Sequence, residues 1–243
     1  TAGSFVLKDN HTNRDATITK DLRAAGALIL GKANLSEWAN IRSERSSSGW
    51  SAIGGQTRNP HDPSRTPCGS SSGSGASVAA NMAIAAIGTE TNGSITCPAA
   101  VNGVVGVKPT VGLASRFGIV PISHTQDTAG PMTKFVDDAA LILQHMSSAD
   151  EHDSATSARA FDRSINLLPA TQSVNEFKLG LFNSSATNHE QVKALEDQII
   201  GWLEKQHVTL VKDLKTNPYS GFWNDTYQVL LFELKHDLNQ YLK

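Results

Sequence analysis

Residues 67–100 read PCGSSSGSGASVAANMAIAAIGTETNGSITCPAA, and this stretch decides the fold. Serine and glycine make up all of residues 69–75 and recur in residues 88–94, with small residues and the apolar run 83–87 between the two segments. Glycine lets the backbone approach a ligand closely and adopt positive φ, so such turns can direct several N–H groups at one point. A disordered linker would rarely be followed at once by ordered elements. We therefore interpret these turns as ordered backbone with a functional role.

The composition of the chain excludes several classes of protein. It has 243 residues, of which 39% are hydrophobic and 18% charged, as is ordinary for a globular protein. A net charge of -2 gives no basic surface for a phosphate backbone, so we expect no nucleic acid as a direct ligand. No apolar run approaches the roughly 20 residues of a membrane helix, and no signal peptide opens the sequence. The compartment, cytoplasmic or periplasmic and secreted, and the choice between monomer and dimer stay open.

The remaining sequence alternates helical and strand patterns. This alternation predicts an α/β fold, with a mixed, mainly parallel β-sheet sandwiched between helices. A polar stretch, residues 147–175, is expected to be a surface excursion. The expected helices are 19–26, 76–80, 136–146, 190–205 and 225 to the end; the expected strands or short buried segments are 27–30, 83–87, 101–107, 118–122, 178–182 and 208–211.

Several collinear blocks resemble the amidase signature family. Besides the opening stretch they are TAGS (1–4), GKANLSEWAN (31–40), GVVGVKPTVGLASRFGIVPIS (103–123) and DTAGPM (127–132). Because the blocks occur in the family's order, the resemblance does not depend on one short motif. It implies the α/β/α amidase signature fold, incomplete at both ends. Residues 1–243 would be part of a single domain, with 1–146 as the signature core and 147–243 as a peripheral α/β portion.

The resemblance also implies the roles of individual residues. Ser94 matches the family's nucleophile, which attacks a carboxamide carbon. Ser70 matches the serine that the family holds on a cis peptide bond and that passes the proton between nucleophile and base. Ser71 matches a neighbour that helps to orient the base. The family's oxyanion-hole segment, whose main-chain N–H groups receive the developing negative charge, corresponds to Thr91, Asn92 and Gly93.

The family's general base is a lysine in a VKDN-like motif, kept neutral by burial. In relatives it precedes the TAGS motif, so we expect it upstream of Thr1 and not within the chain. Lys8 and Lys32 stand in other local contexts and do not replace it. The chain alone is therefore expected to be inactive, since loss of a general base typically costs about 10²- to 10⁴-fold. The chemistry requires no metal and no organic cofactor.

Further residues narrow the expected substrate. Thr96 stands two residues after Ser94, where relatives that act on carboxylate-bearing substrates have an arginine. Threonine cannot bind a carboxylate in the bidentate way of arginine, which disfavours a free-acid substrate. The blocks SGWSAIGGQTRNP (48–60) and LLFELKHDLNQYL (230–242) resemble the peptide amidase branch. This implies release of ammonia from the C-terminal amide of a peptide, so the expected partner is a peptide amide or another small amide.

Three alternatives stay open. One is an amidotransferase A-like subunit or an amidase of another small-amide class. A second is a catalytically dead binding module with the amidase fold, which the missing lysine favours. The third, a Ser-His-Asp hydrolase, is disfavoured because no G-x-S-x-G elbow stands in the right register.

Some other polar residues have a structural interpretation. Cys68 and Cys97 are interpreted first as two buried thiols, with a disulfide as the alternative. Asp127 is expected to hold the signature loop through local hydrogen bonds. The eight histidines are expected to be solvated.

Overall fold

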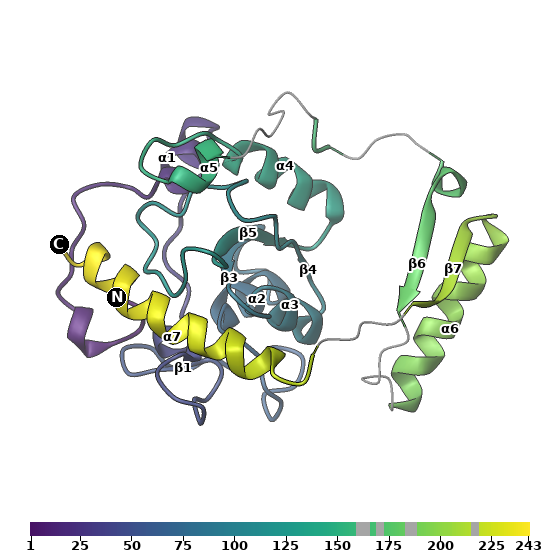
Figure 1. The fold of residues 1–243 in the computed structure, drawn as a ribbon, viewed down its shortest axis with the longest axis horizontal. Coiled ribbons are helices and arrows are strands. Elements are labelled where there is room, and N and C mark those ends of the chain that lie inside the picture. The colour runs from purple at the N-terminus through teal and green to yellow at the C-terminus, as the bar shows by residue number, and fades with distance from the viewer. Residues whose placement is uncertain (159–165, 169–172, 183–188, 215–218) are drawn as a thin grey trace. The chain divides into compact units, whose positions relative to one another are not determined.

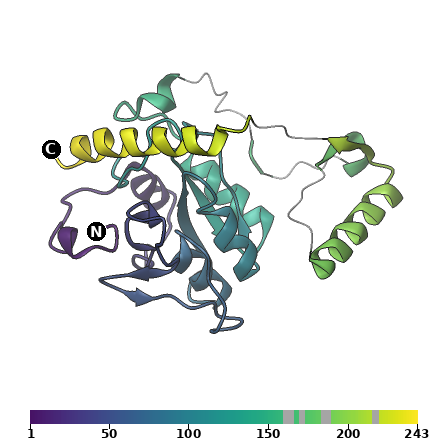
Figure 2. The same ribbon diagram turned by 60° about the horizontal axis from the view of Figure 1, so that its bottom comes forward.

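The structure is a computed structural model that describes residues 1–158, 166–168, 173–182, 189–214 and 219–243. Its chain divides into two compact units, Thr1–Pro169 with Gln228–Lys243, and Ala170–Tyr227. Figures 1 and 2 show the ribbon from two directions. None of the helices in the described ranges combines the length and apolar content needed to cross a lipid bilayer. The expectation of one domain with residues 1–146 as its core stays a prediction.

The first unit contains the Gly-Ser-rich turns. Its helices are α1 (Thr17–Ala24), α2 (Ser72–Ala79), α3 (Thr96–Asn102), α4 (Val136–Met146), α5 (Ser154–Ala158) and the second half of α7 (Phe222–Tyr241), with 3-10 turns η1 (Phe5–Leu7) and η2 (Glu37–Asn40). Its strands are β1 (Trp50–Ser51), β2 (Gly55–Gln56), β3 (Ala85–Glu90), β4 (Val105–Gly106) and β5 (Thr128–Thr133). The first two strands form a small antiparallel hairpin, and the other three form the central sheet.

The central sheet has the order β3–β5–β4, and both of its pairings are antiparallel. β3 and β4 thus run in the same direction and are connected through α3, as in a parallel crossover unit. However, β5 is inserted between them. The expectation of a mainly parallel sheet is therefore wrong for these strands. Alternating strand and helix patterns indicate which strands run in the same direction, but they do not indicate which strands are neighbours.

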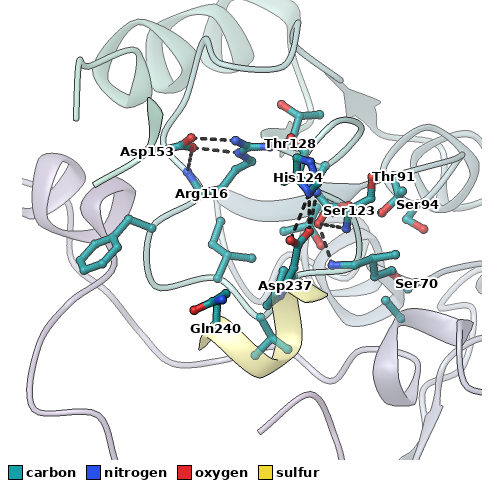
Figure 3. Close-up of a pocket in the computed structure, with 18 of the residues that line it drawn as sticks. Ser70, Thr91, Ser94, Arg116, Ser123, His124, Thr128, Asp153, Asp237 and Gln240 are labelled. Atoms are coloured by element: carbon teal, nitrogen blue, oxygen red, sulfur yellow. Dashed lines mark hydrogen bonds and ion pairs between the residues drawn. The ribbon is translucent and has the colours of Figure 1, made fainter. Parts of the chain in front are cut away.

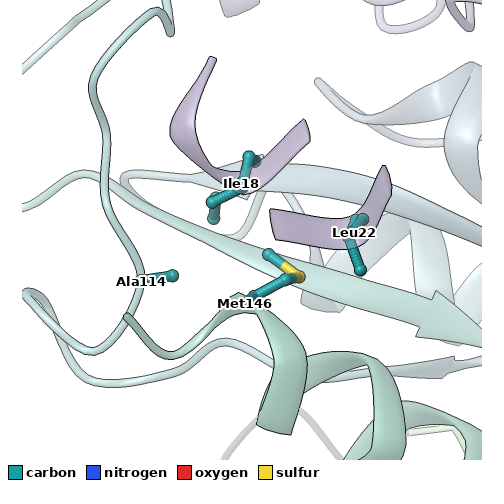
Figure 4. Close-up of a cluster of buried hydrophobic side chains, with 5 residues drawn as sticks. Ile18, Leu22, Ala114 and Met146 are labelled. Atoms are coloured by element: carbon teal, nitrogen blue, oxygen red, sulfur yellow. The ribbon is translucent and has the colours of Figure 1, made fainter. Parts of the chain in front are cut away.

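Helices cover both faces of the central sheet. One buried apolar cluster consists of Ile18, Leu22, Ala114, Ala129 and Met146 (Figure 4). The other consists of Ile95, Ala99 and Met132. Ala129 and Met132 both lie on β5, and because they are an odd number of positions apart they point to opposite faces of the sheet. The helices α1 and α4 therefore pack against one face and α3 against the other, which agrees with the expected sandwich.

The glycines of the Gly-Ser stretch allow close packing around α2. A Cβ atom on Gly73 would lie 2.3 Å from the main-chain oxygen of Asn34. A Cβ atom on Gly75 would lie 3.1 Å from the main-chain oxygen of Pro98, just inside α3. Only glycine permits both approaches without displacing the backbone. The helix begins at Ser72, earlier than the expected start at residue 76.

Three expected segments differ from the structure. Residues 27–30 form no strand, and Leu28 and Leu30 are 88% and 77% exposed. Residues 118–122 also form no strand, and residues 101–107 contain the end of α3 before β4. A short apolar run shows that a segment can be buried, but a strand also needs a neighbour that accepts its hydrogen bonds.

The second unit is a strand–helix–strand arrangement. It contains η3 (Val174–Glu176), β6 (Lys178–Phe182), α6 (Glu190–Lys205) and β7 (Thr209–Leu214). β6 and β7 pair in parallel, as the helical connection between them predicts. The expected bounds 178–182 and 190–205 are confirmed. The helix α7 begins at Phe222, three residues before the expected start.

Candidate active site

A cavity of about 220 Å³ opens beside the Gly-Ser turns (Figure 3). Most of its wall comes from the two Gly-Ser turns, the segment between β4 and β5, and the second half of α7, and further lining residues are Ala39, Thr128, His152 and Asp153. The lining residues that matter below are Ser70, Thr91, Ser94, Arg116, His124, Asp127, Asp153, Asp237 and Gln240. The structure thus brings Ser70 and Ser94 to the same cavity.

Ser70 lies two residues before the start of α2 and is 2% exposed. The peptide bond between Gly69 and Ser70 is cis, as the resemblance implied. The main-chain oxygen of Ser70 accepts a 3.0 Å hydrogen bond from the N–H of Ser36, which holds the segment from its other side. A Cβ atom on Gly69 would lie 2.4 Å from the Ser36 hydroxyl, so the close approach requires glycine there.

Ser94 lies in the short connection between β3 and α3. The buried carboxylate of Glu90, at the end of β3, accepts hydrogen bonds from the N–H groups of Ile95 and Thr96 at 2.7 and 2.8 Å. These N–H groups belong to the unpaired first turn of α3, which a carboxylate stabilises through hydrogen bonding and the helix dipole. Glu90 therefore fixes the direction in which the chain leaves the sheet at Ser94.

Two connections hold the Ser70 and Ser94 segments together. The N–H of Ser71 donates a 3.1 Å hydrogen bond to the main-chain oxygen of Ser94. Cys68 and Cys97 form a disulfide, with their Cα atoms 5.9 Å apart. Our first interpretation of the cysteines as two thiols is therefore wrong. Their separation of 29 residues in the sequence did not reveal that the turns bring them together.

The hydroxyl of Ser71 is used within the fold. It donates a 3.0 Å hydrogen bond to the main-chain oxygen of Thr89 and accepts one of 3.0 Å from the N–H of the same residue. Ser71 is buried and is not among the residues that line the described cavity. Its contacts connect α2 to the end of β3, beside the loop that carries Ser94.

The segment expected to form the oxyanion hole is a turn between β3 and Ser94. Gly93 has a φ of 83°, a conformation that glycine adopts without strain. Within the described part of the chain, the N–H groups of Asn92, Gly93 and Ser94 donate to no protein acceptor. Thr91 and Ser94 line the cavity, whereas Asn92 is exposed and, like Gly93, is not among the lining residues.

Asp127 connects this turn to the segment before β5. One oxygen of its carboxylate accepts a 2.5 Å hydrogen bond from the Thr91 hydroxyl. The other accepts the N–H groups of Ile122 and Ser123 at 2.7 and 2.9 Å. Burial raises the pKa of the Asp127 carboxyl above its usual value, although these hydrogen bonds oppose the shift. The expected structural role of Asp127 is confirmed.

Arg116 is the arginine that lines the described cavity, and its charge is already paired. Its guanidinium donates to both carboxylate oxygens of Asp153, at 2.8 and 2.7 Å, and to the main-chain oxygen of His124. Burial alone would raise the pKa of Asp153, but the hydrogen bonds from Arg116 outweigh it and hold that pKa below its usual value. The same bonds raise the pKa of Arg116. The guanidinium is therefore not free to bind a substrate carboxylate.

Lysine is not found among the residues that line the described cavity. Lys8 is exposed and lies 3.9 Å from the carboxylate of Asp9, and Lys32 is also exposed. Neither is among the residues that line the described cavity.

The sequence did not reveal the part of the wall that α7 forms. Asp237 and Gln240 line the cavity, and the carboxylate of Asp237 accepts the N–H of His124 at 2.7 Å. Figure 3 shows these residues around the cavity with Ser94. His124 remains exposed, but it is paired and not simply solvated. More than a hundred residues separate His124 from Asp237 in the sequence. Only the resemblance of residues 230–242 to the peptide amidase branch drew attention to the α7 segment.

Comparisons with known proteins place this chain in a family. The profile of the family described as Amidase matches residues 1–243. A protein of Arabidopsis thaliana, named as a probable amidase, is 42% identical over 251 residues, which cover 100% of this chain and 48% of that protein. The native peptide amidase from Stenotrophomonas maltophilia has a similar structure, with a TM-score of 0.90 and 46% identity over 99% of this chain and 50% of that one.

Another solved structure has the same fold. An amidase family protein from Bacillus anthracis gives a TM-score of 0.91 and 41% identity, over 99% of this chain and 48% of that one. The chain thus spans about half the length of these solved structures. The likeness confirms the expected fold class, and the family match extends over every residue of the sequence. The chain belongs to the amidase family.

Proposed function

We propose that this chain supplies the serine pair of an enzyme that hydrolyses carboxamides, with Ser94 as the nucleophile and Ser70 as the proton relay. The observation that carries the proposal is that both serines line one cavity. They lie next to a turn whose N–H groups donate to no protein acceptor within the described residues. A serine hydroxyl becomes an effective nucleophile only when a base takes its proton and donors receive the oxyanion. Membership of the amidase family supports the same reaction.

In this mechanism the Ser94 Oγ attacks the amide carbon while its proton passes through Ser70 to the lysine base expected upstream of Thr1. The amide oxygen becomes an oxyanion that accepts hydrogen bonds from the N–H groups of Asn92 and Gly93, with Thr91 nearby. The relay returns the proton to the nitrogen, and ammonia leaves. Water then hydrolyses the acyl-enzyme, which regenerates Ser94 and releases a carboxylic acid. Ser71 positions the Ser70 segment against β3.

The substrate that we propose is the C-terminal amide of a peptide. The likeness to a peptide amidase supports this choice, as does a solved structure of a similar enzyme, the peptide amidase PAM in complex with the competitive inhibitor chymostatin. The pairing of Arg116 with Asp153 supports it too, because the described cavity offers no free guanidinium for a substrate that carries a carboxylate.

Labelling with a fluorophosphonate probe tests the serine assignment. In the full gene product we expect the probe to modify Ser94, as located by mass spectrometry, and the label to be lost in Ser94→Ala. Ser77→Ala is the matched control, because Ser77 belongs to the same Gly-Ser-rich stretch but bonds within α2, to the main-chain oxygen of Ser74. Label that persists in Ser94→Ala would overturn the assignment.

Ammonia release tests the substrate assignment. We expect ammonia from a peptide amide and none from free glutamine. Release from glutamine but not from the peptide amide would favour an amidotransferase A-like activity. If neither compound reacts and the probe labels no serine, the favoured function is a catalytically inert binding module. The observation behind that second candidate is that no lysine lines the described cavity.

A further inference from the structure

We propose that His124, His236 and Asp237 form a binding site for a divalent transition metal, with Zn²⁺ as the ion that fits best, at the edge of the cavity. One ligand atom from each of the three side chains lies within 4.8 Å of the others. His124 comes from the loop before β5, while His236 and Asp237 are consecutive residues of α7. The inference is independent of the proposed hydrolysis.

The donor atoms of the three side chains lie close together. Nδ1 of His124 lies 3.1 Å from each carboxylate oxygen of Asp237. Nδ1 of His236 lies 2.8 Å from Oδ1 of the same carboxylate. Nitrogen and oxygen ligands stand ~2.0–2.2 Å from zinc, so two ligands in a tetrahedral site are separated by roughly 3.4 Å. The carboxylate–imidazole distances are shorter than this separation, so the two exposed imidazole rings would have to rotate away from the carboxylate to admit the ion.

Surrounding groups hold two of the three ligands. The main-chain N–H of His124 donates to Oδ2 of Asp237 at 2.7 Å and fixes the direction of the carboxylate. Nε2 of His124 lies 3.6 Å from the carboxylate of Glu233, whose side chain is 13% exposed. A metal-bound histidine usually presents its second ring nitrogen to such a carboxylate, which sets the tautomer and the ring orientation. Glu233 is itself held by hydrogen bonds from the hydroxyls of Ser123 and Thr125.

The ligand types favour zinc over the hard cations. Two imidazoles and one carboxylate match the donor set of zinc, whereas Ca²⁺ and Mg²⁺ select oxygen ligands alone. Both histidines are exposed, so water can supply the fourth ligand. Because the ligands come from two segments more than a hundred residues apart, a bound ion would connect α7 to the loop that carries His124.

Competition with a chromophoric zinc chelator, together with the visible absorption spectrum after addition of Co²⁺, tests the site. We expect the wild-type protein to withdraw one equivalent of Zn²⁺ from the chelator and to give a Co²⁺ spectrum of low coordination number. In His236→Ala and in Asp237→Asn the affinity should fall by a factor of at least about ten. Glu233→Gln should weaken binding by a factor of about 10 to 100, as loss of such an outer partner usually does.

His145→Ala is the matched control, since His145 is an exposed histidine in the last turn of α4 and is outside the cluster. It should bind zinc like the wild type. His236 is also exposed, and circular dichroism will show that its replacement leaves the protein folded. If the wild type withdraws no zinc, or if His236→Ala binds as tightly as His145→Ala, the three residues are only a hydrogen-bonded cluster and the proposal is overturned.

Discussion

The hydroxyl of Thr91 donates a 2.5 Å hydrogen bond to the carboxylate of Asp127, and this bond connects the turn before Ser94 to the segment of the cavity wall that precedes β5. The second oxygen of the same carboxylate holds two main-chain N–H groups of that wall. One partly buried acidic side chain thus fixes the relative position of two segments that both face the candidate site.

Replacement of Thr91 by valine should destabilise the protein and loosen this turn. The change keeps the shape of the side chain but removes the donor to the partly buried carboxylate of Asp127. We expect the free energy of unfolding to fall by about 1.5–3 kcal/mol, the usual value for a hydrogen bond to a charged group. Urea denaturation measures the change. Thr110→Val is the control, because Thr110 is exposed, and it should change the stability little; equal losses in both variants would contradict the role of the bond.

Asp150 should make the stability of the protein depend on pH in the acidic range. Its buried carboxylate accepts the hydroxyls of Thr17 and Ser115 at 2.5 and 2.6 Å and the N–H of His152 at 2.9 Å. Burial acts to raise the pKa of Asp150, but these hydrogen bonds outweigh it and hold the pKa well below its usual value.

A carboxyl whose pKa is lower in the folded state stabilises that state above its unfolded pKa and loses this contribution as the pH falls toward the folded value. Asp150→Asn should therefore be less stable than the wild type by a constant amount at neutral pH. The difference should shrink below about pH 4, where the unfolded carboxyl binds its proton. Denaturation at a series of pH values measures both effects. Asp9→Asn, at a side chain that is 84% exposed, should show neither.

Asp153→Asn should change what the cavity binds. The carboxylate of Asp153 accepts hydrogen bonds from two nitrogens of the Arg116 guanidinium. A neutral asparagine at position 153 cannot balance the positive charge of Arg116. The freed guanidinium should attract carboxylates, so a peptide with a free C-terminal carboxylate should bind on the order of tenfold more tightly than to the wild type. Calorimetric titration with the free-acid peptide measures this, and thermal melting checks the fold. Unchanged affinity in a folded variant would show that Arg116 does not face the ligand.

Gly130→Ala should prevent normal packing of the central sheet. A Cβ atom at Gly130, in the middle of β5, would lie 1.9 Å from the main-chain oxygen of Val107 and 2.8 Å from Pro109. Backbone and proline ring cannot rotate away as a flexible side chain would. We expect a loss of more than about 3 kcal/mol, at or beyond the upper range for overpacked cores. Gly31→Ala is the comparison, because nothing lies within 4 Å of its Cβ position, and it should fold normally.

The sequence predicted the elements whose patterns are local. The amphipathic helix α6 and the strand β6 occupy the expected residues, because periodicity depends on neighbouring positions alone. The Gly-Ser turns indicated an ordered backbone at residues 69–75 and 88–94, but only the resemblance to the amidase signature family pointed to Ser70 and Ser94 themselves. The role of Asp127 was also predicted, because two of its acceptor contacts lie within five residues.

Long-range relationships could not be predicted in the same way. No local pattern indicates that β5 lies between β3 and β4, or that Asp237 reaches His124 from α7. Apolar residues at 27–30 looked like a strand, but strand formation depends on a partner elsewhere in the chain. The pairing of Arg116 with Asp153, which decides the charge of the cavity wall, has the same long-range origin.

The disulfide between Cys68 and Cys97 makes the candidate site sensitive to reducing conditions. One half of the bond stands two residues before Ser70, and the other stands three residues after Ser94. Buffers that contain dithiothreitol would leave these neighbouring segments connected only through weaker contacts such as that between Ser71 and Ser94. Expression host and storage conditions therefore become experimental variables for any assay of this chain.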